Sequence, residues 1–494
     1  MTRDRGAAID AALVGLVAIA VHARSIGFGF VDLDDRDLIL DDQAFLAQPS
    51  SLWRVFGRAY MHVVDAGHAY YRPVVTWTYA LDAQWSGTRP VGYHLTNVAL
   101  WAGAALVVWG LLRSIGLGRA LAVTGALVFA VHPTLVPAAA WIPGRNDSLL
   151  CVLGVGAWIA LLRRRMALHL VLFGLALLTK ETAVALPLVY AAHAGLLEPE
   201  LRRPRVLGGF SVGWTVLVLA RVLVHPPDVG PTLANLPLLV GSLGELVLPV
   251  HLSPIAVAQD VPWWPGVVAA VALASATWLV PGVRKRVVLL GAVTFVALLV
   301  PSLLLPGSLV LDQRLTLPAV GVVVMLGEIV RALAPEGRMV LAFGGVAAAV
   351  LGAVSVAYEG AFRDARAFAR GAVEGSPHSA MAHFCLGQSY QRAGDDDRAL
   401  AEYLAALALG PAEVVHNNLA VIYMRRAQWP EAESELRGEI AVNPRYARAY
   451  FNLGIVLRRE GRSAEGCASE TTALELQPDD PATRQERDRD CAEQ

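Results

Sequence analysis

Residues 7–23, AAIDAALVGLVAIAVHA, are apolar, and they are followed closely by an acidic stretch at residues 30–45, FVDLDDRDLILDDQAF. The apolar stretch has the length and composition of a membrane-spanning helix. It lacks a small-residue cleavage site before the acidic stretch, so we expect a retained helix and not a removed signal peptide. Asp34 and Asp35 would then lie close to a membrane surface, where acidic side chains are costly unless they are functional.

The composition is that of a membrane protein with a soluble C-terminal part. Of the 494 residues, 55% are hydrophobic and 17% are charged, whereas an ordinary soluble domain carries about 25% charged residues. The charged residues are sparse before residue 357 and dense after it. The net charge of −1 argues against a nucleic-acid partner.

Eleven segments have the apolar composition of membrane spans. They are 7–24, 93–112, 119–136, 147–162, 167–180, 183–197, 206–224, 265–283, 287–305, 317–334 and 338–357. Placing the loops rich in Arg and Lys in the cytosol orients these spans without contradiction. Because the count is odd, the N-terminus is expected in the cytosol and the C-terminus outside it.

One further apolar segment does not fit this alternation. Residues 235–254, NLPLLVGSLGELVLPVHLSP, contain Glu245, and as a span they would place the Arg284–Arg286 loop on the wrong side. We expect this segment to lie at the interface or to re-enter the membrane from the outer side.

A repeat begins after residue 375. The pairs Leu386-Gly387, Leu419-Ala420 and Leu453-Gly454 recur at intervals of about 34 residues, as do three prolines. This period, with small residues for close packing and proline after the second helix, is typical of tetratricopeptide (TPR) helix pairs.

The predicted fold is therefore all-α, with a polytopic helical bundle followed by a TPR solenoid. The expected domains are a membrane domain at 1–357 with a large outer loop at 24–92, a connecting helix at 358–378, TPR repeats at 379–480 and a charged tail at 481–494.

The four cysteines, Cys151, Cys385, Cys467 and Cys491, have no spacing typical of a metal site or a disulfide framework. A Cys467–Cys491 bond is compatible with a C-terminus outside the cytosol, but the sequence favours free thiols.

Polar residues at the span ends remote from the Arg/Lys loops should share one membrane face. A carboxylate that faces cations suits a reaction in which the carboxylate takes a proton from the nucleophile and the cations stabilise an anionic leaving group. We expect catalytic roles for Asp34 and Asp35, phosphate binding by Arg72, Lys180, Arg314 and Arg145, and support from His94, Asn97, His132, Asp147 and Glu181. The plainer alternatives are a solvated acidic loop, a helix cap at His132 and a Lys180–Glu181 pair at a helix end.

The chain resembles TPR-containing transmembrane protein O-mannosyltransferases, which belong to the GT-C class of membrane glycosyltransferases. The resemblance is carried by six segments in order, GFVDLDDRDLIL, YYRPVVTWTYALD, YHLTNVALW, FAVHPTLVPAAAWIPGRND, LLTKETAVALPL and DQRLTLP, followed by the repeats. It implies that Asp34 or Asp35 is the catalytic base, that the donor is a polyprenyl-phosphate sugar and that the acceptor is a protein hydroxyl.

The chain also departs from that family's pattern. Arg36 stands where a third acid is usual, Asp42-Gln43 replaces an Asn-Pro pair, and Leu315 replaces an aromatic residue after Arg314. These changes leave the sugar and the acceptor open, and they leave room for an inactive relative.

The expected function is transfer of a sugar, mannose by resemblance, to Ser or Thr hydroxyls with inversion. No cofactor is required by any spacing, although Asp34 and Asp35 could hold a divalent cation. Two rivals are a non-catalytic TPR scaffold for envelope assembly and a transporter of lipids or lipid-linked sugars. The polar outer face argues against a scaffold, and no inverted repeat supports a transporter.

The repeats are expected to recruit the acceptor protein through polar residues on their first helices. These are His383, Gln388, Asn417, Asn418 and Asn452, and the equivalent positions of Asn418 and Asn452 suggest a ladder that contacts peptide backbone. The alternative is that they are ordinary solvated helix positions. Richness in Ala, Arg and Gly favours a bacterial inner membrane, with the repeats in the periplasm.

The odd span count predicts the side on which the repeats lie. A reporter fused after Gln494 should be active only as a periplasmic enzyme, because each span reverses the side of the chain. Cytosolic activity of that fusion would contradict the topology and the function together.

Overall fold

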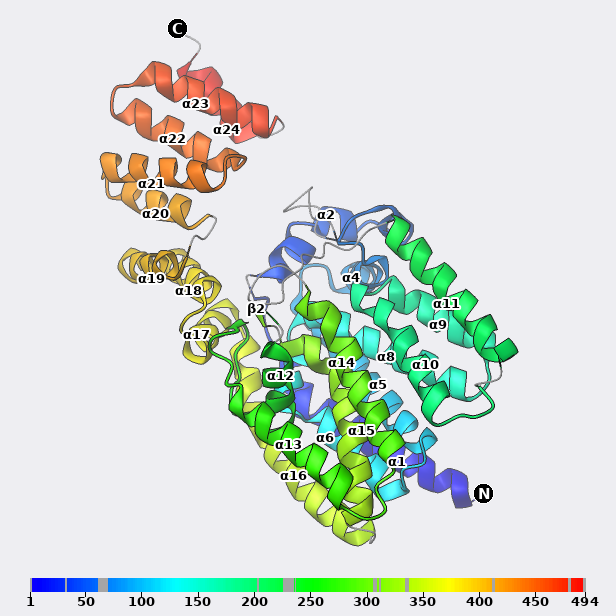
Figure 1. Ribbon diagram of the computed structural model, residues 1–494. Helices are drawn as coiled ribbons and strands as arrows, with labels where there is room; N and C mark the ends of the chain where they lie inside the picture. The colour runs from blue at the N-terminus through cyan, green and yellow to red at the C-terminus, as the bar shows by residue number, and fades with distance from the viewer. Residues whose placement is uncertain are drawn as a thin grey trace. The chain divides into compact units, whose positions relative to one another are not determined.

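The computed structural model describes residues 2–31, 33–60, 70–201, 204–224, 235, 237–304, 309–310, 312–333, 337–410, 414–478 and 481–491. These residues form two compact units, Met1–Gly371 and Ala372–Gln494, which are helical almost throughout (Figure 1). The division falls within the predicted connecting segment 358–378. That segment is not one helix: it holds the end of α16 (Gly337–Glu359), the 3₁₀ turn η9 (Gly360–Phe362) and α17 (Ala365–Gly375).

Every predicted span forms a helix in the first unit. The helices are α1 (Thr2–His22), α5 (Pro90–Ser114), α6 (Arg119–Ala130), α8 (Arg145–Leu162), α9 (Met166–Leu177), α10 (Leu186–Leu196), α11 (Pro204–Val224), α13 (Trp264–Leu279), α14 (Lys285–Leu303), α15 (Thr316–Leu333) and α16. The all-α prediction is confirmed. The described residues add one pair of two-residue antiparallel strands, β1 (Ala256–Val257) and β2 (Leu309–Val310).

The expected count of eleven spans is not confirmed. Among the described residues, six helices are long and apolar enough to cross a membrane, and a seventh span results if α6 and the bent continuation Pro133–Ala140 are counted as one. These helices make the chain a membrane protein. The apolar helix Met166–Leu177 is about 18 Å long, which is short of a hydrocarbon core of about 30 Å. The orientation of the chain therefore stays a prediction.

The segment between α1 and α5 is a folded part of the first unit. It contains the π-helical turn η2 (Arg36–Leu40), the short helices α2 (Gln43–Leu46) and α3 (Ser51–Arg54), the turn η3 (Val55–Gly57) and the longer α4 (Pro73–Ser86). Ile39, Leu46, Val55 and Tyr79 are completely buried in the core of the unit. The acidic stretch is therefore anchored by Leu38 and Ile39, and the chain after it by Leu46, Val55 and Tyr79.

The segment 235–254 contains α12 (Pro237–Val247), which packs against α13. A helix of eleven residues is about 16 Å long and cannot cross a bilayer. This agrees with the expectation that the segment does not span the membrane.

Close packing in the first unit depends on glycine at one helix crossing. Gly291 of α14 faces Gly321 of α15, and a Cβ added at Gly291 would lie 2.6 Å from the carbonyl oxygen of Gly321. Small residues of this kind let membrane helices approach closely.

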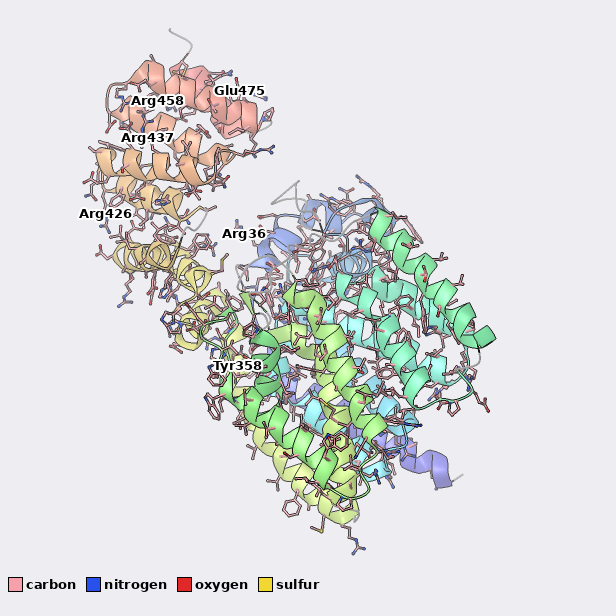
Figure 2. All side chains as sticks on the ribbon, viewed as in Figure 1. Arg36, Tyr358, Arg426, Arg437, Arg458 and Glu475 are labelled. Carbon is pink, nitrogen blue, oxygen red and sulfur yellow. A yellow bond between two sulfur atoms is a disulfide. The ribbon has the colours of Figure 1, made fainter. Side chains whose placement is uncertain are left out.

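The second unit consists of the predicted helix pairs. They are α18 (Ala380–Arg392) with α19 (Asp396–Leu409), α20 (Val415–Arg425) with α21 (Trp429–Val442), and α22 (Ala447–Arg459) with α23 (Ser463–Leu476), followed by α24 (Pro481–Asp490). Leu386, Leu419 and Leu453 are buried at equivalent positions, as the repeat pattern requires. Arg426, Arg437 and Glu475 are exposed on this unit, whereas Arg458 is mostly buried against Glu470 (Figure 2).

A disulfide joins Cys467 of α23 to Cys491, just after α24. The expectation of free thiols at these two positions was wrong, because spacing alone did not show that α24 folds back onto α23. Cys151 and Cys385 form no disulfide. Stable disulfides generally form in oxidising compartments, and the side of the membrane on which the repeats lie stays a prediction.

Removing this bond should destabilise the repeat unit. The bond closes a loop of 24 residues, and in the chain-entropy account a loop of this size contributes about 3 kcal/mol. Cys467→Ser should therefore lower the melting temperature of the second unit, measured by thermal denaturation of the purified chain. Cys385→Ser is the matched control and should change the melting temperature little; equal melting of all three proteins would mean that the bond does not form.

Candidate active site

The structure separates the roles of Asp34 and Asp35. Asp35 is 1% exposed, and its Oδ2 accepts a hydrogen bond of 2.7 Å from the backbone N–H of Val31. Asp34 is only partly buried, and within the described chain no hydrogen bond or ion pair engages its carboxylate. Asp35 is therefore held through one oxygen, while its buried Oδ1 has no hydrogen-bond partner in the described chain. Asp34 is the more accessible of the two carboxylates.

Burial raises the pKa of Asp34 to about 6, while the positive charges of Arg72 and Arg314 oppose this increase. The pKa of Asp35 is also raised above its ordinary value, mainly by burial, with the Val31 hydrogen bond acting in the other direction. A carboxyl group whose pKa is close to neutral pH can accept a proton efficiently from a reacting hydroxyl.

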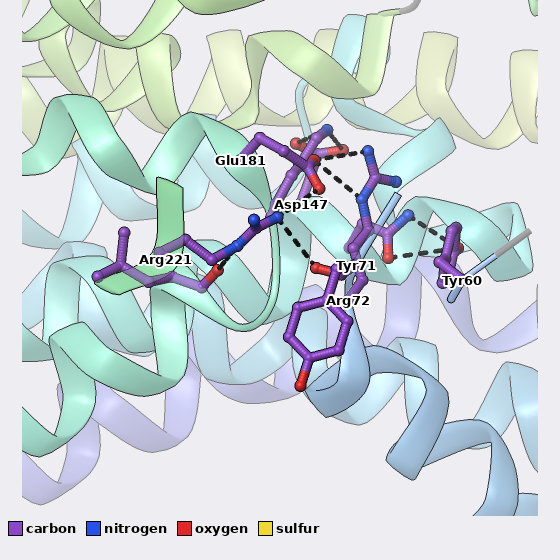
Figure 3. Close-up of polar contacts among 9 residues, drawn as sticks. Tyr60, Tyr71, Arg72, Asp147, Glu181 and Arg221 are labelled. Atoms are coloured by element: carbon purple, nitrogen blue, oxygen red, sulfur yellow. Dashed lines mark hydrogen bonds and ion pairs between the residues drawn. The ribbon is translucent and has the colours of Figure 1, made fainter. Parts of the chain in front are cut away.

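Arg72, which precedes α4, is held in a network of charges (Figure 3). Its guanidinium donates hydrogen bonds of 2.9 and 3.1 Å to Oε2 of Glu181, and it lies over the rings of Tyr60 and Tyr70. The other oxygen of Glu181 accepts a hydrogen bond of 3.2 Å from Arg221. Glu181 thus holds two arginines at one place.

Lys180 and Arg314 are two further cations of the predicted set, and both interact electrostatically with Arg72. The Lys180 ammonium donates to both oxygens of Asp147 at 2.7 Å. Arg314 has no hydrogen bond or ion pair in the part of the chain that the structure describes, although it acts electrostatically on Asp34. Arg314 is therefore the cation with free donors, while Lys180 and Arg72 are positioned by carboxylates.

Arg145 lies in the core of the unit, where its charge acts on Asp35. It is 0% exposed, and its guanidinium donates to Asp82 at 2.6 Å, to Asn97 at 2.8 Å, to Thr78 at 3.0 Å and to the Tyr93 carbonyl at 2.7 Å. Its donors are already used by the protein. The expectation that Arg145 binds the donor phosphate is therefore corrected: this arginine ties α4, α5 and α8 together.

The five residues expected to support the site also fall into two groups, those paired with the cations and those bound to the surrounding structure. Asp147 and Glu181 hold Lys180 and Arg72, whereas Asn97 is bound to the carbonyls of Trp141 and Ile142 as well as to Arg145. His94 and His132 are buried, and His94 contacts the carbonyl of Gly29 at 3.3 Å. His94 and Asn97 therefore hold neighbouring backbone segments, and none of the three residues is hydrogen-bonded to Asp34 in the described chain.

An apolar groove of about 790 Å³ leads away from the network between α9 and α11. It is lined by Leu170, Val171, Leu175, Val216 and Leu217, with Tyr71 and Arg221 at its polar end. Arg221 donates to the Tyr71 carbonyl and to Glu181, so the groove ends at the charge network. A site of this form can hold a chain-like apolar group with a charged head.

The described residues contain no group of three or more His, Cys, Asp or Glu that could hold a metal ion. Asp35 directs one oxygen to the Val31 backbone and is buried. A divalent ion at Asp34 and Asp35 stays a prediction.

In the repeat unit, the predicted acceptor-binding amides bond to each other. Asn452 donates to Asn417 at 2.8 Å, Asn417 to Asn418 at 3.4 Å, and Asn418 to the hydroxyl of Tyr403 at 3.3 Å. His383 is paired with Glu402 at 2.6 Å, and Gln388 is partly buried on α18. The ladder exists, but it joins successive repeats from within instead of presenting free amides to a peptide.

Two elements of the site were not anticipated. Arg221 is a cation inside the apolar span 206–224, and an ionisable residue within a membrane segment is by itself a sign of function. Tyr60 and Tyr70 flank Arg72, but their outer loop offered no periodic signal that placed them near it.

Comparisons with known proteins agree with the sequence pattern. The family described as tetratricopeptide repeat matches residues 332–414 and 417–481. The chain is 31% identical over 187 residues to protein O-mannosyl-transferase Tmtc1 of Drosophila melanogaster, covering 35% of this chain and 21% of that protein. It is 32% identical over 157 residues to protein O-mannosyl-transferase TMTC4 of Homo sapiens, covering 28% and 21%.

These matches confirm the resemblance to TPR-containing protein O-mannosyltransferases, at modest identity. The aligned part of the chain spans about a fifth of the length of these curated relatives. Among solved structures, the APC/C hetero-tetramer Cut9–Hcn1 aligns with 84% of this chain and 89% of its own, at 12% identity and a TM-score of 0.25. A score that low supports no argument about the fold.

The raised pKa of Asp34 predicts that this residue costs stability. Its pKa of about 6 exceeds the unfolded value of about 3.9, so the folded state is penalised as pH rises through that interval. At pH 7.5 Asp34→Asn should stabilise the chain by about 1–3 kcal/mol, and the gain should vanish below about pH 4.

Thermal denaturation in detergent across this pH range measures the effect. Asp35→Ala is the contrasting variant, because loss of the Val31 partner should destabilise the chain by about 1–3 kcal/mol. Destabilisation of the chain by Asp34→Asn at pH 7.5 would contradict an open, unpaired carboxylate.

Proposed function

We propose that this chain is a membrane glycosyltransferase that moves a sugar from a polyprenyl-phosphate donor to Ser or Thr hydroxyls of proteins. The observation that carries the proposal is the open carboxylate of Asp34, which faces the charges of Arg72 and Arg314. The names of the relatives, protein O-mannosyl-transferases, support mannose as the sugar.

Asp34 is the general base in this proposal. The acceptor hydroxyl attacks the anomeric carbon of the donor, and its proton passes to the Asp34 carboxylate as the new C–O bond forms. A positioned base of this kind typically accelerates transfer by about 10²–10⁴-fold. Asp35, held by Val31, is the positioning residue that keeps the turn in place.

The leaving group is the polyprenyl phosphate, which takes the electron pair of the broken bond between C1 and the phosphate oxygen. Arg314 has free donors for that developing charge, and Arg72 presents a guanidinium already oriented by Glu181. Guanidinium groups contact phosphate oxygens bidentately. Attack opposite the leaving phosphate in a single displacement inverts the anomeric centre.

The donor's lipid chain is assigned to the groove between α9 and α11. The groove is apolar along its length and ends at Arg221 and Tyr71 beside the network. A polyprenyl tail in the groove would bring its phosphate to the cationic end without exposing apolar surface to water.

The repeats are assigned to protein recognition on the same side of the membrane. TPR solenoids generally present extended binding surfaces, and the Cys467–Cys491 bond agrees with an extracytoplasmic, periplasmic location. Because the Asn ladder is satisfied internally, acceptor contacts must use other side chains.

A non-catalytic membrane scaffold is the second candidate. It would explain the repeats, but it gives no reason to hold Arg72 and Arg314 near an unpaired carboxylate. Burying charge without function is costly, so transfer chemistry is favoured.

Loss of Asp34 should abolish transfer. With a polyprenyl-phosphate sugar and an acceptor peptide, Asp34→Asn should lower kcat by about 10²–10⁴-fold, and Arg314→Ala should lower kcat/KM for the donor. Mass spectrometry of the peptide measures the product. Arg164→Ala, an exposed arginine paired with Glu198 and Glu200, is the control and should stay active; full activity of the Asp34 variant would show that the base lies elsewhere.

The pH dependence of the same assay follows from the pKa of about 6 for Asp34. Only the deprotonated base accepts a proton, so kcat/KM should fall about tenfold per pH unit below pH 6 and be level above it. A profile that is flat down to pH 4.5 would contradict this assignment.

A further inference from the structure

Besides the apolar groove between α9 and α11, the first unit contains a polar cavity of about 500 Å³. It is formed by the end of α5, the end of α10 and the start of α14. Glu181 lies in the 3₁₀ turn that precedes α10. The cavity is lined by the opposite end of that helix, from His193 onward. The cavity therefore faces the loops rich in Arg and Lys and is separate from Asp34.

The cavity is lined by three consecutive cations, Arg284, Lys285 and Arg286. Arg284 is bound by Glu328 at 2.6 and 2.8 Å, and Lys285 lies 3.7 Å from the centre of the Trp278 ring. Arg286 has no hydrogen bond or ion pair in the described parts of the chain. After the neutralisation of Arg284, two positive charges still face the cavity.

The start of α14 contributes backbone donors to the same place. α14 has 19 residues and begins at Lys285. The Arg284 N–H is taken by Glu328, and those of Val287 and Val288 by the Arg284 carbonyl, so in the described chain the first turn offers the N–H groups of Lys285 and Arg286. Together with the positive end of the helix dipole, such groups favour an anion. One carboxylate, Glu198, also lines the cavity, but it is within 3.7 Å of Arg164.

His193 provides an independent observation. Its side chain is 2% exposed and lines the cavity, yet Nδ1 has no hydrogen-bond partner within the described chain. A buried polar atom without a partner costs free energy. A ligand with oxygen acceptors in the cavity would remove that cost.

We propose that this cavity binds the phosphate group of an anionic ligand, with Arg286 and Lys285 as its cations and His193 as a donor. Two sources share this chemistry, an anionic phospholipid headgroup and free phosphate. The lipid headgroup is favoured, because the exposed apolar side chains of Trp278 and Leu289 stand beside the cations. Basic pockets between membrane helices on the cytoplasmic side generally bind acidic headgroups.

The test uses the full chain purified in detergent. Native mass spectrometry compares retention of phosphatidylglycerol with that of phosphatidylcholine of the same acyl chains, and thermal denaturation measures stabilisation by inorganic phosphate. Arg286→Gln is the test variant, since its side chain is exposed and its loss should not disturb folding. Arg163→Gln, an exposed arginine outside the cavity lining, is the matched control.

We expect selective retention of phosphatidylglycerol, reduced about tenfold in Arg286→Gln by the loss of one charge-assisted contact, and unchanged in Arg163→Gln. Stabilisation by inorganic phosphate that depends on Arg286, without selective lipid retention, would support the phosphate site and assign it to the soluble ion. If Arg286→Gln and Arg163→Gln behave alike in lipid retention and in stabilisation by phosphate, the proposal is wrong. This outcome is independent of whether Asp34→Asn abolishes sugar transfer.

Discussion

The buried ion pair between Arg145 and Asp82 is the contact on which the rest of the site depends. The two side chains are 0% and 3% exposed and lie 2.6 Å apart, and Arg145 also binds Asn97 and the Tyr93 carbonyl. An unpaired charge at this depth would be strongly destabilising, so α4, α5 and α8 can pack in one arrangement only. That arrangement places Arg72 before α4 and Asp147 at the start of α8.

Around this core the charges are divided between positioned and open groups. Glu181 holds Arg72 and Arg221, and Asp147 holds Lys180, so these cations have fixed positions and little freedom to reorganise. Asp34 and Arg314 are left without such partners in the described chain. Fixed charges around open groups are the form of preorganisation that stabilises charge developing during a reaction.

The length of each helix was harder to anticipate than its existence. All eleven predicted spans are helical, because their apolar composition and flanking loops are local features. Lys180, Glu181 and Pro187 interrupt what the sequence presents as two adjacent spans, and the chain forms α9, a 3₁₀ turn and the eleven-residue α10 instead. Hydropathy reports where a chain is apolar, but the breaks between helices depend on which polar groups find partners.

The sequence by itself determined the helical membrane region, the TPR period and the acidic stretch next to the first apolar helix, because each is a local pattern of residue types. Only the tertiary structure decided which carboxylate is open, that Arg145 belongs to the core and that Cys467 meets Cys491. The deciding partners are far apart in the chain: Arg72 and Glu181 are 109 residues apart, and Arg145 and Asp82 are 63. Such pairing is fixed by packing in three dimensions, and no local pattern records it.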